Sequence, residues 1–458
     1  MDKKILFIGG GVVLAFIALV IVLFSGGCNR NNGPVTKTGA TTLTFWNLYD
    51  DKIAFDQIIA EFNRTHPKVK IEYVKKNPET FLEDSLNEMS AGKGPDIWGV
   101  PNTWLPKYHD KLVPIKNTAI ENKKAFKTAS DVYKETYPSV VAQDNIIDDK
   151  VYGFPMSIDT LRLYFNSSLS SRIWQDYVLE NRDQLNSPLA KVFSDGPTNW
   201  DELVQMIPII TKKKGDKIER SAIAFGTSNN IDHADDIITL LMMQNGAVMN
   251  SGDLTTAQFH TKQNQFGNIE FPGTKALEFY TSFADSKNKN YTWNNTMPNT
   301  IQAFADEKVV MLVDYKDAEQ EIRRLNSKVS LRTIAVPQVK LTRNNVNLAS
   351  YQSLTVTKAS KNSDLAWDFI LFMTQDQLQL NNYKLATNKT IARNNSLGSS
   401  IDGAQAKESK SWFNPDPLRV SVILKEMIKQ VNDGKSAQTA IEGAASQTSD
   451  LLKKLKGN

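Results

Sequence analysis

The histidines of this chain are too far apart to suggest a metal or catalytic site. They stand at His66, His109, His233 and His260, with none of the short spacings that zinc ligands share. A nucleophilic site built around a histidine base has no support for the same reason. We therefore expect no metal, no cofactor and no catalytic residue of this kind.

Carboxylates could act in pairs, as they do in glycoside hydrolases, where two are held a fixed distance apart across the scissile bond. Three pairs of aspartates are adjacent in the sequence: Asp50 with Asp51, Asp148 with Asp149, and Asp235 with Asp236. Adjacent side chains point in different directions, so helix caps and turns explain these pairs better than catalysis. We expect a protein that is not an enzyme, with a glycoside-acting enzyme or a surface binding protein as the alternatives.

Aromatic rings stand beside amides or carboxylates where several predicted strands end. These pairs are Trp46 with Asn47, Asn102 with Trp104, and Asp314 with Tyr315. A ring next to a hydrogen-bonding group is typical of small-molecule sites. Packing in a core is the alternative for each ring, and a turn or a helix cap is the alternative for each carboxylate.

The elements that must position these residues alternate between strands and helices. A strand at 43–46, a helix with an apolar stripe at 55–62, a strand at 69–73, a helix at 82–89 and a buried run at 95–100 follow one another. Asp50 or Asp51 could cap the first helix, and Asp96 is expected to bond nearby backbone amides. This order predicts a parallel sheet that binds ligands at the carboxyl ends of its strands.

The same alternation recurs beyond residue 150. The sequence predicts extended segments at 151–155 and 161–166 joined across Asp159, a helix opening at 197–203 with Thr198 or Asn199 as its cap, strands at 223–225 and 309–313, a helix at 364–374, and two terminal helices between about 417 and 455 that separate at 432–434.

Length and charge limit the class of protein. A chain of 458 residues is too long for one ordinary core, so we expect two or three folded units. Its 54 basic and 50 acidic residues are spread along the chain without a basic block, which argues against nucleic acid as a partner.

The N-terminal segment, residues 1–27, reads as a signal or anchor. A short charged start precedes an apolar run at 5–24, and small residues lead to Cys28, the only cysteine of the chain. This resembles a bacterial lipoprotein signal, in which the cysteine is lipidated after cleavage. An uncleaved membrane anchor is the alternative, because about 20 apolar residues can span a bilayer. Residues 28–40 are polar and read as a flexible linker.

The order of short motifs resembles family 1 of the extracellular solute-binding proteins, the group that includes maltose-binding proteins. The residues that carry the resemblance are 43–46, 94–98, 112–115, 152–155, 164–166, 198–203, 303–304, 310–311, 335–337, 355–362 and 366–370. It covers nearly all of residues 41–455.

This resemblance implies an α/β fold of type II with two lobes, each a mostly parallel sheet flanked by helices, joined by a multi-strand hinge. Residues 41–157 plus 338–376 would form the first lobe, and 158–337 plus 377–458 the second. It also implies an extracytoplasmic receptor of an ABC importer, monomeric, anchored outside the cell membrane and docking on a membrane permease. The solute would be a small molecule, with a mono- or oligosaccharide as the first expectation.

The resemblance also assigns roles to particular residues. A neutral sugar offers flat CH faces and hydroxyls, which suit rings and polar side chains. Asp159 falls where the family often places a ligand-binding acid, and Tyr315 lies in a segment similar to its ligand-stacking loop. The expected ligand-binding residues are Trp46, Asn47, Asn102, Trp104, Asp159, Trp293, Asp314, Tyr315, Tyr351 and Trp412.

Overall fold

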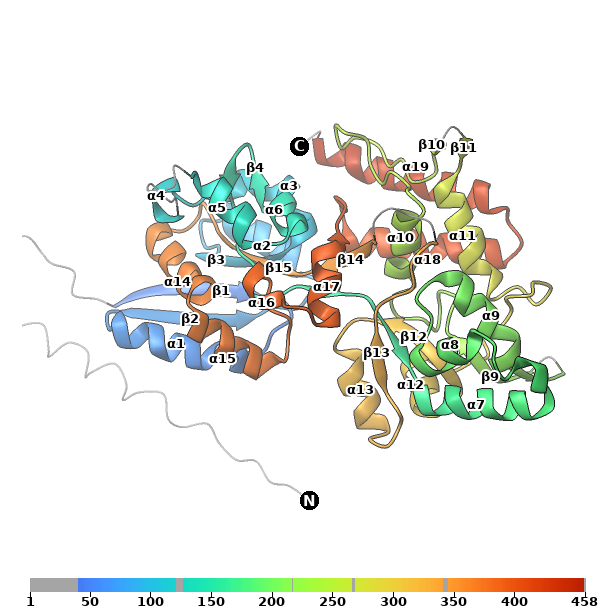
Figure 1. The fold of residues 1–458 in the computed structure, drawn as a ribbon. Coiled ribbons are helices and arrows are strands. Elements are labelled where there is room, and N and C mark those ends of the chain that lie inside the picture. The colour runs from blue at the N-terminus through green and yellow to red at the C-terminus, as the bar shows by residue number, and fades with distance from the viewer. Residues whose placement is uncertain (1–39, 121–126, 216, 266–267, 341–344, 457–458) are drawn as a thin grey trace, which may run out of the picture. The chain divides into compact units, whose positions relative to one another are not determined.

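A computed structural model describes residues 40–120, 127–215, 217–265, 268–340 and 345–456 (Figure 1). Residues Thr41–Asn458 group together as one unit. The predicted signal segment and Cys28 lie outside the described ranges. Within those ranges, no helix combines the length and the apolar character needed to cross a membrane.

The first sheet has the strand order β15-β3-β1-β2. Its strands are β1 (Thr41–Asn47), β2 (Val69–Lys75), β3 (Ile97–Pro101) and β15 (Gln352–Val356). β1 is parallel to β2 and to β3, and β15 runs antiparallel to β3. The predicted parallel sheet is confirmed for the three N-terminal strands, whose carboxyl ends therefore meet at one edge.

Helices alternate with these strands as the periodicity predicts. They and the short elements that follow are α1 (Ile53–Thr65), α2 (Phe81–Ser90), η1 (Asn102–Trp104), α3 (Leu105–Tyr108), η2 (His109–Lys111), α4 (Asn117–Ile120), α5 (Ala129–Thr136), α6 (Ser139–Asn145), β4 (Ile146–Ile147) and β5 (Lys150–Val151). α1 buries Phe55, Ile58 and Phe62 on one stripe. Such a stripe at helical spacing gives the helix one apolar face to pack on the sheet.

Neither predicted acidic residue caps α1. The residue at the cap position is Lys52, which makes no side-chain cap hydrogen bond. Asp50 is buried and its carboxylate instead accepts a hydrogen bond from the Tyr383 hydroxyl and pairs with Lys389. The cap prediction is wrong because partners from the distant C-terminal part of the sequence take this side chain.

The second sheet has the order β13-β7-β12-β9-β8. Its strands are β7 (Arg162–Phe165), β8 (Lys212–Lys214), β9 (Lys217–Ile223), β12 (Val309–Asp314) and β13 (Arg332–Ile334). β12 is parallel to β9, but β7 is antiparallel to β12 and to β13, and β8 is antiparallel to β9. The prediction of a mostly parallel sheet is therefore wrong for this sheet. Every residue of β12 is buried, which confirms the short buried strand predicted at 309–313.

Helices and short strands surround this second sheet. They are α7 (Ser167–Glu180), η4 (Arg182–Gln184), α8 (Leu189–Asp195), α9 (Trp200–Ile210), α10 (Ala234–Gln244), β10 (Gln263–Gln265), β11 (Asn268–Glu270), α11 (Pro272–Ser282), α12 (Thr300–Ala305), α13 (Ala318–Leu325), α18 (Pro417–Asn432) and α19 (Ala437–Lys456). The last two are the predicted terminal helices. Gly434 between them has a φ of +100°, a backbone conformation that favours glycine.

A small sheet of order β16-β14-β6 joins three distant stretches of the chain. Its strands are β6 (Asp159–Thr160), β14 (Asn347–Ser350) and β16 (Ser409–Lys410). Only Tyr351 separates β14 from β15, so one extended stretch passes from this sheet into the first sheet. Figure 1 shows β14 and α17 (Ile401–Glu408) between the elements of the first sheet and those of the second.

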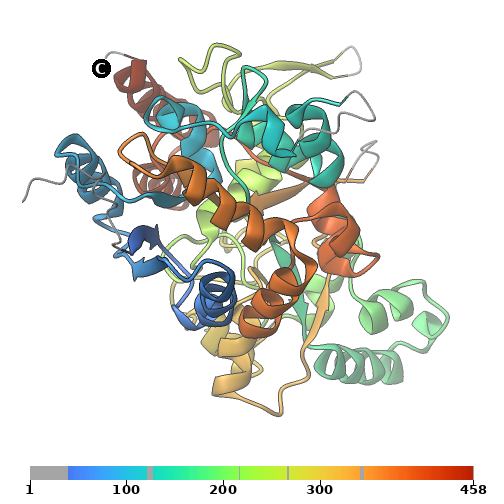
Figure 2. The same cartoon turned by 90° about the vertical axis from the view of Figure 1, so that its left-hand side faces the viewer.

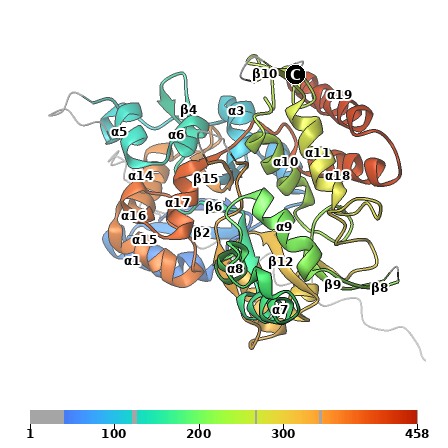
Figure 3. The same cartoon turned by 45° about the vertical axis from the view of Figure 1, so that its right-hand side comes forward.

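The first sheet has a hydrophobic core that also takes in later parts of the chain. α14 (Ser363–Gln375), predicted at 364–374, packs there together with α15 (Gln377–Thr387) and α16 (Asn394–Leu397). The rings of Phe55 and Tyr383 lie 5.8 Å apart. Figure 3 shows α15 beside α1, and in Figure 2 the orange helices lie next to the blue ones.

The lobe limits stay a prediction, but this packing bears on one of them. Leu380, Tyr383, Ile391 and Ala406 are buried in the core of the first sheet. We expected the chain to leave the first lobe at residue 376. Because a domain is built around its own core, the packing favours an end near residue 406.

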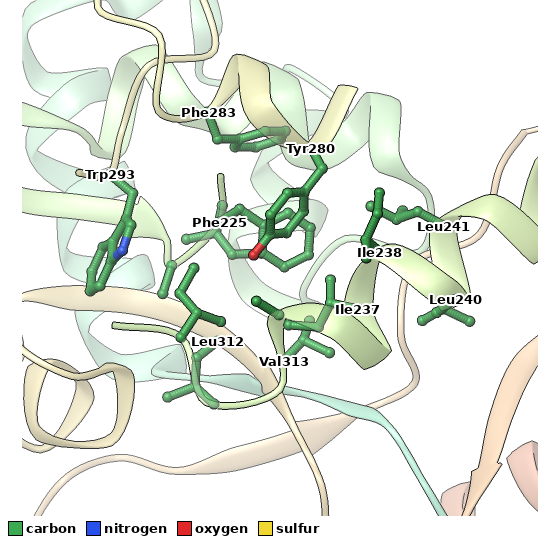
Figure 4. Close-up of a cluster of buried hydrophobic side chains, with 14 of the residues drawn as sticks. Phe225, Ile237, Ile238, Leu240, Leu241, Tyr280, Phe283, Trp293, Leu312 and Val313 are labelled. Carbon is green, nitrogen blue, oxygen red and sulfur yellow. The ribbon is translucent and has the colours of Figure 1, made fainter. Parts of the chain in front are cut away.

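The second sheet has a separate core. Figure 4 shows part of it, where Ile237 of α10 lies near Val313 of β12 and the Tyr280 ring of α11 lies beside Phe225. Two sheets with separate cores, joined by a small sheet, are the arrangement expected of two lobes.

Candidate ligand-binding site

The predicted site residues at strand ends lie where the sequence places them. Trp46 and Asn47 are the last two residues of β1, Asn102 follows β3 directly, and Asp314 is the last residue of β12. Carboxyl ends of parallel strands are where α/β sheets bind ligands. The structure thus supplies the expected positions, and the surroundings of each side chain decide what it can do.

The carboxylate of Asp144, near the end of α6, accepts hydrogen bonds from three distant segments of the chain. Its Oδ2 accepts hydrogen bonds from Asn102 Nδ2 at 2.8 Å and from the Tyr351 hydroxyl at 2.6 Å. Its Oδ1 accepts one from Ser411 Oγ at 2.5 Å, next to Trp412. Burial raises the pKa of Asp144, while the three donors oppose that rise. The sequence did not single out Asp144, although it brings Asn102 and Tyr351 together.

Asp159, in the small sheet, lies within a cluster of charged groups. Its Oδ1 accepts from Arg162 Nη2 at 2.7 Å and its Oδ2 from the Lys316 backbone N–H at 3.1 Å. Arg162 and Lys316 both pair with Asp402, at 2.8 and 3.2 Å. Burial raises the pKa of Asp159, and Arg162 opposes that rise. Both oxygens of Asp159 therefore already have protein donors.

A third cluster joins the end of β12 to the start of α10. His233 Nε2 lies 3.4 Å from Asp314 Oδ1, and His233 Nδ1 lies 3.6 Å from Asp236 Oδ2. The Tyr315 hydroxyl donates to the same Asp236 oxygen at 3.1 Å, and its ring meets the His233 ring edge-on at 5.0 Å. The predicted residues Asp314 and Tyr315 thus share one cluster with His233 and Asp236, whose roles the sequence did not reveal.

Tyr49, in the loop after β1, feels the charge of this cluster. It keeps 57% of its surface exposed, yet burial and then the negative charge of Asp236 raise its pKa. The charge of a carboxylate on α10 therefore acts on a ring that follows β1. Tyr49 was missed because its surroundings in sequence, Leu48 and Asp50, carry no spacing signal.

Trp46 and Trp104 are mostly packed. Each is 9% exposed, within a small core that also holds Trp98 and Tyr108. The Lys76 ammonium lies 3.6 Å from the centre of the Trp46 ring, a cation–π contact. Both rings sit at the edge of the core, so only part of each could meet a solute.

Two further predicted residues are buried. Trp293 has no exposed surface, and its indole N–H donates to Asn230 Oδ1 at 3.1 Å within the core of Figure 4. Asn47 is 1% exposed, and a Cβ added at Gly99 would stand 2.4 Å from its amide oxygen. Trp293 and Asn47 are therefore packed inside the protein in this arrangement, as Asn102 and Asp314 largely are at 4% and 3% exposed. Trp412 is half-buried against the core of the second sheet.

Asp96 behaves as expected of a structural residue. Its Oδ2 accepts from the Thr44 backbone N–H at 2.8 Å, and its Oδ1 accepts from Ser360 Oγ at 2.5 Å.

Across the described ranges, no group of three His, Cys, Asp or Glu side chains could hold a metal ion.

Curated relatives are similar to this chain over part of their length. The galactooligosaccharide-binding protein of Bacillus subtilis (strain 168) is 22% identical over 182 residues, which cover 38% of this chain and 40% of that protein. An uncharacterized ABC transporter extracellular-binding protein of Pyrococcus horikoshii is 26% identical over 204 residues, covering 40% of this chain and 42% of that protein. The chain thus matches about two fifths of these relatives.

Solved structures match almost the whole chain. The sugar-binding protein MalE of Xanthomonas citri has a TM-score of 0.69 at 19% identity, covering 91% of this chain and 98% of that one. The cyclic alpha-maltosyl-1,6-maltose binding protein of Arthrobacter globiformis has a TM-score of 0.69 at 17% identity, covering 91% and 100%. These matches confirm the predicted α/β two-lobe fold of type II.

The family follows from a match to the sequence itself. The model described as "Bacterial extracellular solute-binding protein" matches residues 57–408, more than half of the chain. The resemblance seen in the sequence is thereby confirmed. This chain belongs to the family of bacterial extracellular solute-binding proteins.

Proposed function

We propose that this protein is the extracytoplasmic receptor of an ABC importer and that it captures a sugar between its two lobes. A sugar is proposed as the solute because the chain is similar to a protein named for binding galactooligosaccharides. The ring-and-carboxylate groups of the candidate site suit the same chemistry, because rings cover CH faces while carboxylates accept hydrogen bonds from hydroxyls. The importer is inferred from the relative named as an ABC transporter binding protein.

The solute would touch residues from both lobes. Tyr49, Trp46 and Trp104 would meet it from the first lobe, and Asp314 and Tyr315 from the second. Asn102, Tyr351, Asp159 and Trp412 would line the region where the chain passes between lobes. A solute that contacts both sides favours the closed arrangement by its higher affinity for that state.

The permease and the anchor are further parts of this proposal. The closed form would dock on a pair of membrane-spanning permease subunits as a monomer. Cys28 would carry a lipid, or residues 5–24 would remain as a membrane anchor. Mass spectrometry of the protein purified from its own membrane would separate the two, because lipidation removes the segment before Cys28 and adds acyl mass.

A titration tests the proposed function. The full chain in mild detergent would be titrated with galacto- and malto-oligosaccharides while tryptophan fluorescence is followed, with amino acids and polyamines as other classes. We expect saturable binding of at least one oligosaccharide and no hydrolysis product by chromatography. Release of shortened sugars would establish the glycoside-acting enzyme instead. A folded protein that responds to no oligosaccharide would overturn the proposal.

A further inference from the structure

His233 stands between two carboxylates that come from different elements. Asp236 belongs to the first turn of α10 and Asp314 is the last residue of β12. The imidazole has one nitrogen toward each of them, at 3.6 and 3.4 Å. These contacts use Oδ2 of Asp236 and Oδ1 of Asp314, one oxygen of each carboxylate. The side chain of His233 is 38% exposed, so the cluster reaches the protein surface.

Only the doubly protonated ring carries the positive charge that attracts both carboxylates at these ion-pair distances of 3.6 and 3.4 Å. A neutral imidazole has a single N–H and can donate to one of them, whereas the imidazolium donates from both nitrogens. Without the positive charge, two carboxylates would face each other across a neutral ring and repel. The charge of His233 therefore adds to the hydrogen bonds that Tyr315 donates to Asp236, at 3.1 Å, and to Asp314, at 2.7 Å, in holding the two carboxylates.

The surrounding charges favour the imidazolium. Groups that face the cluster are Tyr315 after β12, Tyr49 after β1, Asp232 and Asp235 beside His233, Asp317 before α13, and Lys425 of α18. Lys425 is paired with Asp235 at 3.5 Å and is the cation of this group. The acids outnumber it, so the local potential is negative and stabilises a positive ring.

We propose that His233 is a positioning residue of the solute site, whose imidazolium holds Asp236 and Asp314 so that their other oxygens accept hydrogen bonds from solute hydroxyls beside the Tyr49 ring. Loss of the proton from His233 then weakens solute binding. This inference rests on the proposed function, since it needs a solute with hydroxyl donors at this place.

The titration behaviour of the cluster agrees with this geometry. Burial acts to lower the pKa of His233, but the hydrogen bond to Asp236 and the charges of Asp314 and Asp236 outweigh it and raise the pKa to about 9. Burial raises the pKa of Asp314 to about 6, and His233 opposes that rise. Between these two values the ring is charged and Asp314 is ionised, which is the state that positions both acids.

Solute affinity measured against pH tests the inference. The probe is the oligosaccharide of the panel that binds the full chain most tightly at pH 7, and its Kd would be measured by calorimetry from pH 7 to 10. A bound state that requires the imidazolium should lose affinity by about tenfold at pH 10, one unit above the pKa. His233→Gln, with one N–H donor and no charge, should bind about tenfold more weakly at pH 7 and show a flat profile.

A matched variant and a direct titration exclude other causes. His260→Gln changes a half-buried histidine elsewhere and should leave both the Kd and its pH profile unchanged. Nitrogen NMR of the imidazoles should show His233 titrating near pH 9, and nearer 6.5 in Asp236→Asn. A wild-type Kd that is constant from pH 7 to 10, or a His233 that titrates at 6–7, overturns the inference while leaving sugar binding intact. Failure of every oligosaccharide at pH 7 overturns the proposed function and this inference with it.

Discussion

Asp144 is a residue on which three distant parts of the chain meet. Its donors Asn102, Tyr351 and Ser411 are 42, 207 and 267 residues away. Asp144→Ala leaves these donors without their acceptor, so we expect the free energy of unfolding to fall by about 1–3 kcal/mol. Urea denaturation measures it. Asp110→Ala, which removes an exposed ion pair with Lys111, should change it by less than about 0.5 kcal/mol. Equal midpoints for the two variants would contradict the role given to Asp144.

Asp159 illustrates why a ligand role and a structural role must be tested separately. Asp159→Ala would leave the buried Arg162 with Asp402 as its remaining carboxylate partner, so it should lower the melting temperature as well as the affinity. Asp159→Asn keeps an acceptor oxygen for Arg162 and should stay closer to the wild-type melting temperature while binding the sugar more weakly. Melting curves and a Kd for both variants decide the matter. An Asn variant with unchanged affinity would remove Asp159 from the solute site.

At the scale of elements, two side chains accept hydrogen bonds from backbone N–H groups at the start of α9. Asn199 Oδ1 accepts from the Glu202 backbone N–H at 3.0 Å, and Glu202 reaches back to the Thr198 backbone N–H at 2.7 Å. The sequence predicted either Thr198 or Asn199 as the N-cap of α9, and in the structure the N-cap is Asn199. Asn199→Ala should reduce the free energy of unfolding by about 1 kcal/mol. Asn199→Gly should cost only a few tenths, so a larger loss for Gly than for Ala in urea denaturation would argue against capping.

The elements could be predicted from sequence because their signals are local. The apolar stripe of α1 repeats at the period of a helix, and β12 is a short continuous apolar run of the length of a buried strand. The side-chain clusters could not be predicted, because Asp50 near the start of the folded chain meets Tyr383 and Lys389 near its end. From sequence, Trp293 was expected to be a ligand-binding ring, but its indole has no exposed surface and packs in the core of the second sheet.

At the scale of the whole molecule, two cores are joined through short strands rather than through a shared interior. The small sheet of β6, β14 and β16 has two residue pairs between neighbouring strands, fewer than the seven that join β1 to β2. A ladder this short has few backbone hydrogen bonds to distort when it bends. Such hinges allow two lobes to close on a ligand without any change inside either core.

A solute held by both lobes should therefore stabilise the molecule through contacts that the unliganded protein lacks. At a sugar concentration 100 times its Kd, we expect the free energy of unfolding to rise by about 2.7 kcal/mol, measured by urea denaturation with and without sugar. Tyr49→Ala should lose most of this gain at the same sugar concentration, because the exposed ring feels the charge of Asp236 and contributes to binding rather than to a core. Leu385→Ala, an 85% exposed apolar residue on α15, is the matched control and should keep the full gain. If Tyr49→Ala keeps it too, the solute does not lie beside this ring, and the site must be sought nearer to Asp144 and Trp412.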